Sequence, residues 1–238
     1  MIRFSVLDVS FFSTHYASAA DLLAGNEREP TQPAYALLVG RARRFTSLLT
    51  QLHIEVCGAL APEGKEDQLA VFATSHGEIQ TAEAMIKGIR QRTVSGARFA
   101  LSVHNTASGL HSVATGNHAP TTTVTGKNAV AAGWLEAALT ALANERTVLL
   151  SIADEPVPDL FQADAAKFGV AAAFLLGPRN AGGRAAELAI APGADADIEP
   201  APVLARAIDS WTGTSHDAID LGPIQPGKRL SLRFAERS

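Results

Sequence analysis

Apolar residues along this chain switch repeatedly between the two-residue spacing of strands and the longer spacing of helices. In the segment from Met1 to Val9, Ile2, Phe4 and Val6 fall on one face, which predicts a half-buried strand. Further strands are predicted at residues 68–74, 98–103, 121–125, 148–153, 170–176, 186–190 and 229–234. Helices are predicted at residues 40–60, 78–92, 105–116, 128–143 and 203–211. This alternation predicts a layered α/β fold.

The pattern changes after Gly177. The chain becomes rich in glycine and proline, with one weak strand, a short helix and a final alternating strand. This stretch is too short for a second full layered domain. We therefore predict one domain in residues 1–177, with residues 178–238 as a C-terminal appendage packed on it.

Composition and charge narrow the class of protein. The 238 residues are 47% hydrophobic and 18% charged, with a formal net charge of −4, as in ordinary globular proteins. The lysines and arginines form no continuous basic stripe, which argues against a nucleic-acid partner. No window approaches the ~20 apolar residues of a membrane span. The single cysteine, Cys57, excludes an internal disulfide and fits a reducing cytoplasm. No cofactor is predicted.

The most informative segment begins at Ser102. It reads Ser-Val-His-Asn-Thr-Ala-Ser-Gly, then Gly116, Ala119-Pro120, and Thr-Thr-Thr-Val-Thr-Gly-Lys-Asn before an alanine-rich helix. This segment resembles the core of the β-ketoacyl synthase N-terminal half, which has a thiolase-like fold. The resemblance implies a layered α/β structure with a mixed sheet.

The resemblance places Asn105 and Gly109 on the family's Asn and Gly, and Asn128 where the family has its nucleophilic cysteine. A carboxamide cannot ionise to a nucleophile, so no acyl-enzyme can form there; Asn128 instead reads as a helix N-cap. The family's catalytic histidines come from a C-terminal half, and here the tail offers only His216. We therefore expect a non-enzyme, similar to the chain length factors of bacterial aryl polyene clusters.

The resemblance also implies the partners. Family members dimerise through the strand before the nucleophile, so the expected interface with a full-length ketosynthase comprises Thr121, Thr122, Thr123, Val124, Thr125 and Asn105. Residues expected to wall the partner's acyl tunnel are Arg98, Phe99, Ala100 and Ser102. An acyl carrier protein would bind through this heterodimer. The expected role is to limit the length of a polyene or polyketide chain.

Two other functions stay open. The chain could be a stand-alone acyltransferase or hydrolase that uses Ser102 or Ser108 with His104, although it has no G-x-S-x-G motif. It could also be a homodimeric scaffold that binds carrier protein.

Other reactive residues have simpler explanations. His104, His111 and His118 recur every seven residues, but seven helical residues rise ~10.5 Å, too far for one metal ion. Cys57, on the apolar face of a helix, is interpreted as inert. Glu78 and the pair at 154–155 are interpreted as helix-start and turn residues.

Overall fold

The computed structural model describes residues 1–40, 43, 46–60, 67–162, 165–213 and 215–236, without the side chains of residues 97 and 98. The strands are β1 (Ile2–Ser13), β2 (Leu69–Thr74), β3 (Thr121–Thr125), β4 (Val148–Asp154), β5 (Val170–Gly177), β6 (Arg184–Pro192), β7 (Ile219–Gln225) and β8 (Lys228–Phe234). The helices are α1 (Ala19–Ala24), α3 (Leu48–Leu60), α4 (Ile79–Gln91), α5 (Gly96–Ala100), α6 (Thr106–Thr115), α7 (Ala129–Asn144) and α8 (Pro200–Thr212).

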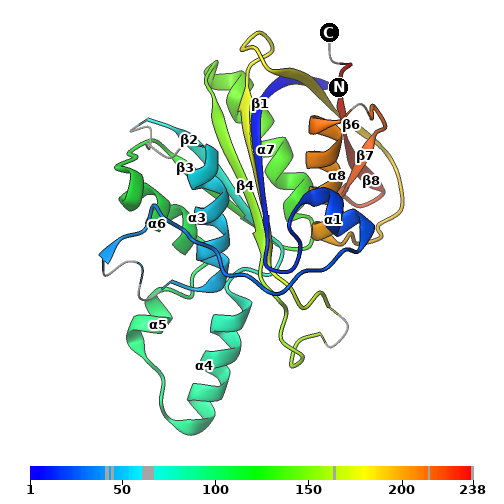
Figure 1. Ribbon diagram of the computed structural model, residues 1–238. Helices are drawn as coiled ribbons and strands as arrows, with labels where there is room; N and C mark the ends of the chain where they lie inside the picture. The colour runs from blue at the N-terminus through cyan, green and yellow to red at the C-terminus, as the bar shows by residue number, and fades with distance from the viewer. Residues whose placement is uncertain (41–42, 44–45, 61–66, 163–164, 214, 237–238) are drawn as a thin grey trace.

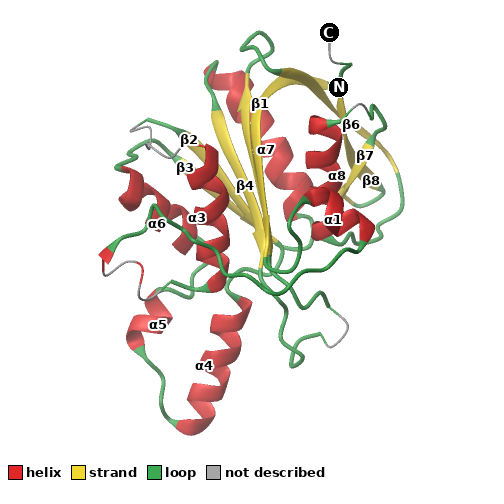
Figure 2. Ribbon diagram, viewed as in Figure 1, coloured by secondary structure: helices red, strands yellow, loops and turns green. Residues whose placement is uncertain are grey.

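The described strands form one mixed sheet in the order β3-β2-β4-β5-β1-β6-β8-β7. β2 pairs in parallel with β3 and β4, and the other neighbours are antiparallel. Helices cover both faces: α3 and α6 lie on one, α7 and α8 on the other (Figures 1 and 2). The fold is therefore a layered α/β structure, as the hydrophobic pattern predicts.

The central strands are buried on both faces because a core lies on each side of the sheet. In β2, Val71 and Ala73 belong to the core under α7 and α8, whereas Ala70 and Phe72 belong to the core under α3. This double burial explains why β2, β4 and β5 read as continuous apolar runs rather than alternating ones. Helix α7 lies so close to the sheet that a Cβ on Gly133 would come within 2.8 Å of the Ala73 Cβ.

The C-terminal strands extend the same sheet. β6 pairs with β1, so the sheet continues past Gly177. The domain boundary that the sequence predicts at this residue stays a prediction. The buried guanidinium of Arg184 ties the tail together: its Nε donates to the Ala235 carbonyl at 2.8 Å and its Nη1 to the Trp211 carbonyl at 2.9 Å. No helix in the described part of the chain is long and apolar enough to cross a membrane.

Some predicted elements differ from the structure. Residues 98–103 are not a strand, because α5 occupies Gly96–Ala100 and a turn follows. The predicted helix at 40–60 becomes α3, which begins at Leu48; residues 41–42 and 44–45 lie outside the described residues. The pattern also misses α1 and β7: α1 is short, and β7 contains Gly222 and Pro223, which disfavour strands.

Candidate functional site

Asn128 lies at the junction between the edge strand β3 and helix α7. Gly126, with φ of 112°, turns the chain after the strand, and the amide of Ala129 donates to the Gly126 carbonyl at 2.8 Å. Asn128 occupies the N-cap position, and its carbonyl accepts the first helical hydrogen bond from Ala132 at 2.9 Å. The sequence therefore places this residue correctly at a strand-to-helix junction.

Asn128 occupies the predicted N-cap position, but its side chain does not cap the helix. Its φ and ψ of −102° and 15° depart from the extended backbone that aims an N-cap side chain at the first-turn amides. The half-buried carboxamide makes no capping hydrogen bond. Because the lone pair of an amide nitrogen is delocalised into the carbonyl group, the carboxamide of residue 128 is not a nucleophile that could form an acyl-enzyme.

In the described structure, the serines and the histidine considered for a stand-alone hydrolase are not linked by hydrogen bonds. The Ser102 hydroxyl donates to the Phe99 carbonyl at 2.7 Å, and the Ser108 hydroxyl donates to the Asn105 carbonyl at 2.9 Å. His104 is exposed, and no hydrogen bond links it to either serine in the described structure. A hydrolase would need a base within hydrogen-bond reach of its nucleophile.

Two histidines and the cysteine are buried and neutral. Burial lowers the pKa of His53 to about 3 and that of His111 to about 4, so both imidazoles are uncharged at neutral pH. Burial raises the pKa of Cys57 to about 12, which keeps the thiol protonated at neutral pH. Within the described residues no group of three His, Cys, Asp or Glu side chains could hold a metal ion.

Three buried carboxyl groups lie at the carboxyl ends of the parallel strands β2 and β4: Glu78, Asp154 and Glu155. Glu155 joins two helices, because its Oε1 accepts the amide of Gln80 at 2.8 Å and its Oε2 that of Leu49 at 3.2 Å. Those amides belong to the first turns of α4 and α3, where helix dipoles favour a negative charge, but burial outweighs this preference and raises the pKa of Glu155. Glu155 thus fixes the start of α4 against α3.

Glu78 strengthens the same connection. Its Oε1 accepts the hydroxyls of Ser47 at 2.7 Å and Thr50 at 3.2 Å, and its Oε2 accepts that of Thr81 at 3.2 Å. The sequence interpretation treats Glu78 and Asp154-Glu155 as separate local features. Only the parallel pairing of β2 with β4 brings them together, so the signal that could have revealed the cluster is the strand order.

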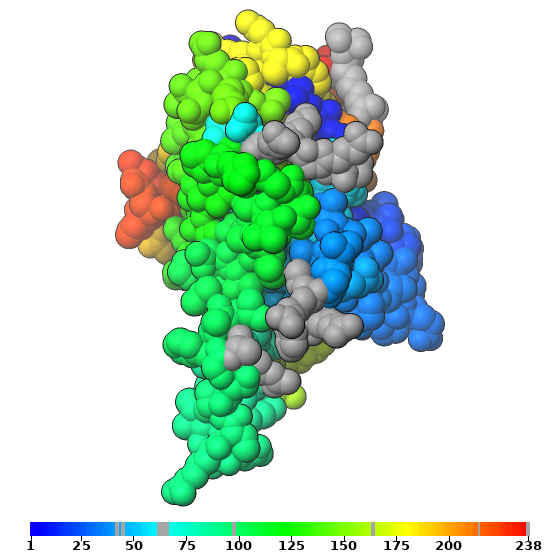
Figure 3. Space-filling model, turned by 90° about the vertical axis from the view of Figure 1, so that its left-hand side faces the viewer, coloured from blue at the N-terminus to red at the C-terminus, as the bar shows by residue number. Residues whose placement is uncertain are grey.

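Helices α4 and α5 form an arm that extends away from the sheet (Figure 1). Large apolar side chains on the arm and the turn after it face solvent, with Phe99 61% exposed and Ile89 62% exposed. Of the predicted tunnel-wall residues, Phe99 and Ala100 lie exposed in α5 and Ser102 is half-buried just after it. The Arg98 side chain is outside the described residues. In the space-filling view of Figure 3, the arm lies below the region of α6 and β3.

Comparison with known proteins identifies the family. The family described as "Beta-ketoacyl synthase, N-terminal domain" matches residues 17–208, and the chain belongs to it. No curated protein is similar at a significant level.

The solved structures that are similar to the chain include two ketosynthase and chain length factor complexes. One is "Ketosynthase (ApeO) in Complex with its Chain Length Factor (ApeC) from Xenorhabdus doucetiae", with a TM-score of 0.72 and 19% identity over 98% of this chain and 100% of that chain. The other is "The ishigamide ketosynthase/chain length factor", with a TM-score of 0.62 and 15% identity over 89% of this chain and 73% of that chain. These likenesses confirm the predicted thiolase-like fold.

The connection made by Glu155 predicts a pH dependence of stability. Burial raises the pKa of Glu155 from 4.5 to about 7. The folded protein therefore binds this proton more tightly than the unfolded chain, so the stabilisation is complete below pH 4.5 and is lost as the pH rises to about 7. Relative to Glu155→Gln, the wild-type free energy of unfolding should fall across this window by up to about 1.4 kcal/mol per pH unit.

Urea unfolding at a series of pH values measures this difference. Glu29→Gln, at an exposed loop position, serves as the control and should follow the wild type throughout. Wild-type and Glu155→Gln curves that stay parallel over the window would show that Glu155 does not titrate there.

Proposed function

We propose that this chain is a non-catalytic chain length factor that pairs with an active β-ketoacyl synthase. The observation that carries the proposal is Asn128, a carboxamide at the strand-to-helix junction where the family resemblance expects a thiol. The junction keeps the geometry that would present a nucleophile but carries a group unable to attack an acyl thioester. His216 lies 3.3 Å from the Arg184 guanidinium, in the tail rather than at this junction.

The free edge of β3 supports a paired state. The Gly126 amide donates to the Thr74 carbonyl of β2 at 3.3 Å, and Thr125 lies opposite Thr74. Because N–H groups alternate in direction along a strand, the amides of Thr121, Thr123 and Thr125 point to the edge that has no neighbouring strand in the sheet. Such a row of unpaired groups is a template for a strand of another chain.

The opposite edge of the sheet is less suited to pairing. β7 contains Gly222 and Pro223, and its pairing with β8 shifts register on either side of them. Proline removes an amide and bulges twist an edge strand, and both features hinder addition of another strand. We therefore place the partner on β3, with Thr121–Thr125 and Asn105 in the interface.

The exposed apolar residues of the arm suit the predicted tunnel wall. In the proposed heterodimer, Arg98, Phe99, Ala100 and Ser102 reach the acyl tunnel of the synthase, and Phe99 fills volume at its end. The rigid connection through Glu78 and Glu155 holds α4 in place, so the depth of insertion is fixed. The product would be a polyene or polyketide chain, carried by an acyl carrier protein that binds through the complex.

Pairing through β3 is tested by Thr123→Pro, because proline removes an outward-facing amide at the middle of the edge. The variant should lose the heterodimer, whereas Thr123→Ala, which keeps the amide and removes the hydroxyl, should retain it. Co-expression with the ketosynthase followed by size-exclusion chromatography measures pairing, and circular dichroism verifies that each variant is folded. A folded Thr123→Pro protein that still elutes with its partner would exclude pairing through β3.

The tunnel wall is tested by Phe99→Ala in the reconstituted heterodimer. Removing the ring opens space at the tunnel end, so the products should be longer by at least one extension unit, as measured by mass spectrometry of the released chains. Ile190→Ala, at an exposed apolar position on β6, is the control and should leave the products unchanged. Identical product lengths for Phe99→Ala and wild type would remove Phe99 from the wall.

A further inference from the structure

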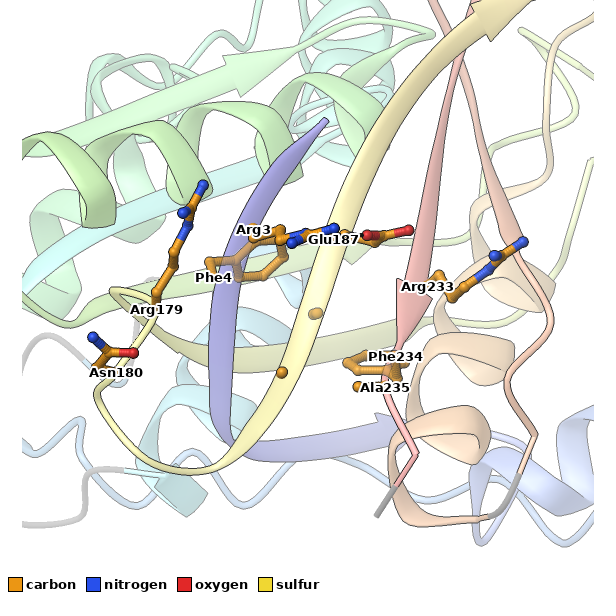
Figure 4. Close-up of a pocket in the computed structure, with 10 residues that line it drawn as sticks. Arg3, Phe4, Arg179, Asn180, Glu187, Arg233, Phe234 and Ala235 are labelled. Carbon is orange, nitrogen blue, oxygen red and sulfur yellow. Dashed lines mark ion pairs between the residues drawn. The ribbon is translucent and has the colours of Figure 1, made fainter. Parts of the chain in front are cut away.

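A hollow of about 500 Å³ lies over β1, β6 and β8, on the half of the sheet away from β3 (Figure 4). This volume is within the range of small-molecule sites. The residues that line it are Arg3, Phe4, Arg179, Asn180, Ala185, Ala186, Glu187, Arg233, Phe234 and Ala235. Three arginines face one glutamate in this set, which gives two net positive charges in a protein whose net charge is −4.

The strand register fixes most of these charges. Arg3 lies directly opposite Glu187, and Glu187 lies directly opposite Arg233, so the three side chains form a row across adjacent strands. The Arg3 Nε and the Glu187 Oε2 are 3.6 Å apart and form an ion pair. Ala185, which also lines the hollow, is small and leaves the floor open.

Two guanidinium groups remain without a partner in the described structure. Arg233 and Arg179 are exposed, and neither side chain makes a hydrogen bond or ion pair with another described residue. Figure 4 shows them on opposite sides of the Arg3–Glu187 pair. Arg179 is on the turn after β5, and that turn is fixed because the Ser5 hydroxyl donates to the Arg179 carbonyl at 3.0 Å.

We propose that this hollow binds a small phosphate-bearing dianion between Arg179 and Arg233. Guanidinium groups match the planar, bidentate recognition of phosphate oxygens better than any other side chain. The two net positive charges of the hollow balance the two negative charges of a phosphate dianion. The size of the hollow suits a small molecule rather than a protein helix, which is about 10 Å across with its side chains. The ligand could come from free phosphate or from a phosphate ester.

The proposed site is independent of the chain length factor role. β1, β6 and β8 are separated from β3 by β2, β4 and β5 in the sheet, so changes at the hollow should leave pairing through β3 intact. The two proposals can therefore fail separately. A protein that forms the heterodimer but does not bind the anion contradicts only the anion site, and one that binds the anion but does not form the heterodimer contradicts only the pairing.

Isothermal titration calorimetry at constant ionic strength tests the site, using the protein as purified, with any ketosynthase that accompanies it. The probes are inorganic phosphate and glycerol 3-phosphate. The wild type should bind at least one, and the double variant Arg179→Gln/Arg233→Gln should bind it about tenfold or more weakly. Arg206→Gln, an exposed position on α8 outside the hollow, should bind like the wild type. Tighter binding of glycerol 3-phosphate would identify an ester as the ligand, and equal binding would identify phosphate itself.

Three results would overturn the proposal. The first is that neither probe binds to the wild type at about 10 mM. The second is that the wild type and the double variant bind a probe with equal affinity. The third is that the wild type binds a poly-glutamate peptide but neither probe. The last result would make the hollow a contact for an acidic protein.

Discussion

The edge of β3, which has no neighbouring strand among the described residues, is the constraint on which the proposed assembly depends. β2 is buried on both faces and holds β3 in parallel register, so alternate amides of β3 are directed away from the sheet. Pairing with another strand stabilises these amides, because a buried backbone N–H without a hydrogen-bond partner raises the free energy of the protein. The α6–β3 region and the exposed arm lie on one face of the molecule (Figure 3), so a partner on this edge would also meet the arm.

The geometry next to this edge is a strand-to-helix junction with a carboxamide at its corner. Gly126 makes the turn, α7 begins at Ala129, and Gly133 allows the helix to lie close to β2. All of these features serve packing as well as chemistry, so they persist when the reactive side chain is replaced. Under the proposed function, the chain keeps this fold while a partner performs the condensation.

Much of the fold follows from the sequence, because burial on two faces produces apolar runs that local pattern detects. The β-branched run Thr121–Thr125 and the alanine-rich helix after Asn128 are both where the pattern places them. The failures are at positions decided by distant contacts. Residues 96–100 form a helix in an arm with little packing around it, and the connection of Glu155 to Leu49 and Gln80 depends on strand order. Asn128 is at the predicted N-cap position, but the pattern does not predict its backbone angles, which leave the helix without a side-chain cap.

The most direct test is intact-protein mass spectrometry of the heterodimer after incubation with an acyl-loaded carrier protein. If this chain is the silent subunit, the added acyl mass appears on the ketosynthase alone, and this chain keeps its unmodified mass. An acyl adduct on this chain, above all one located at residue 128, would contradict the claim that the junction has lost its chemistry.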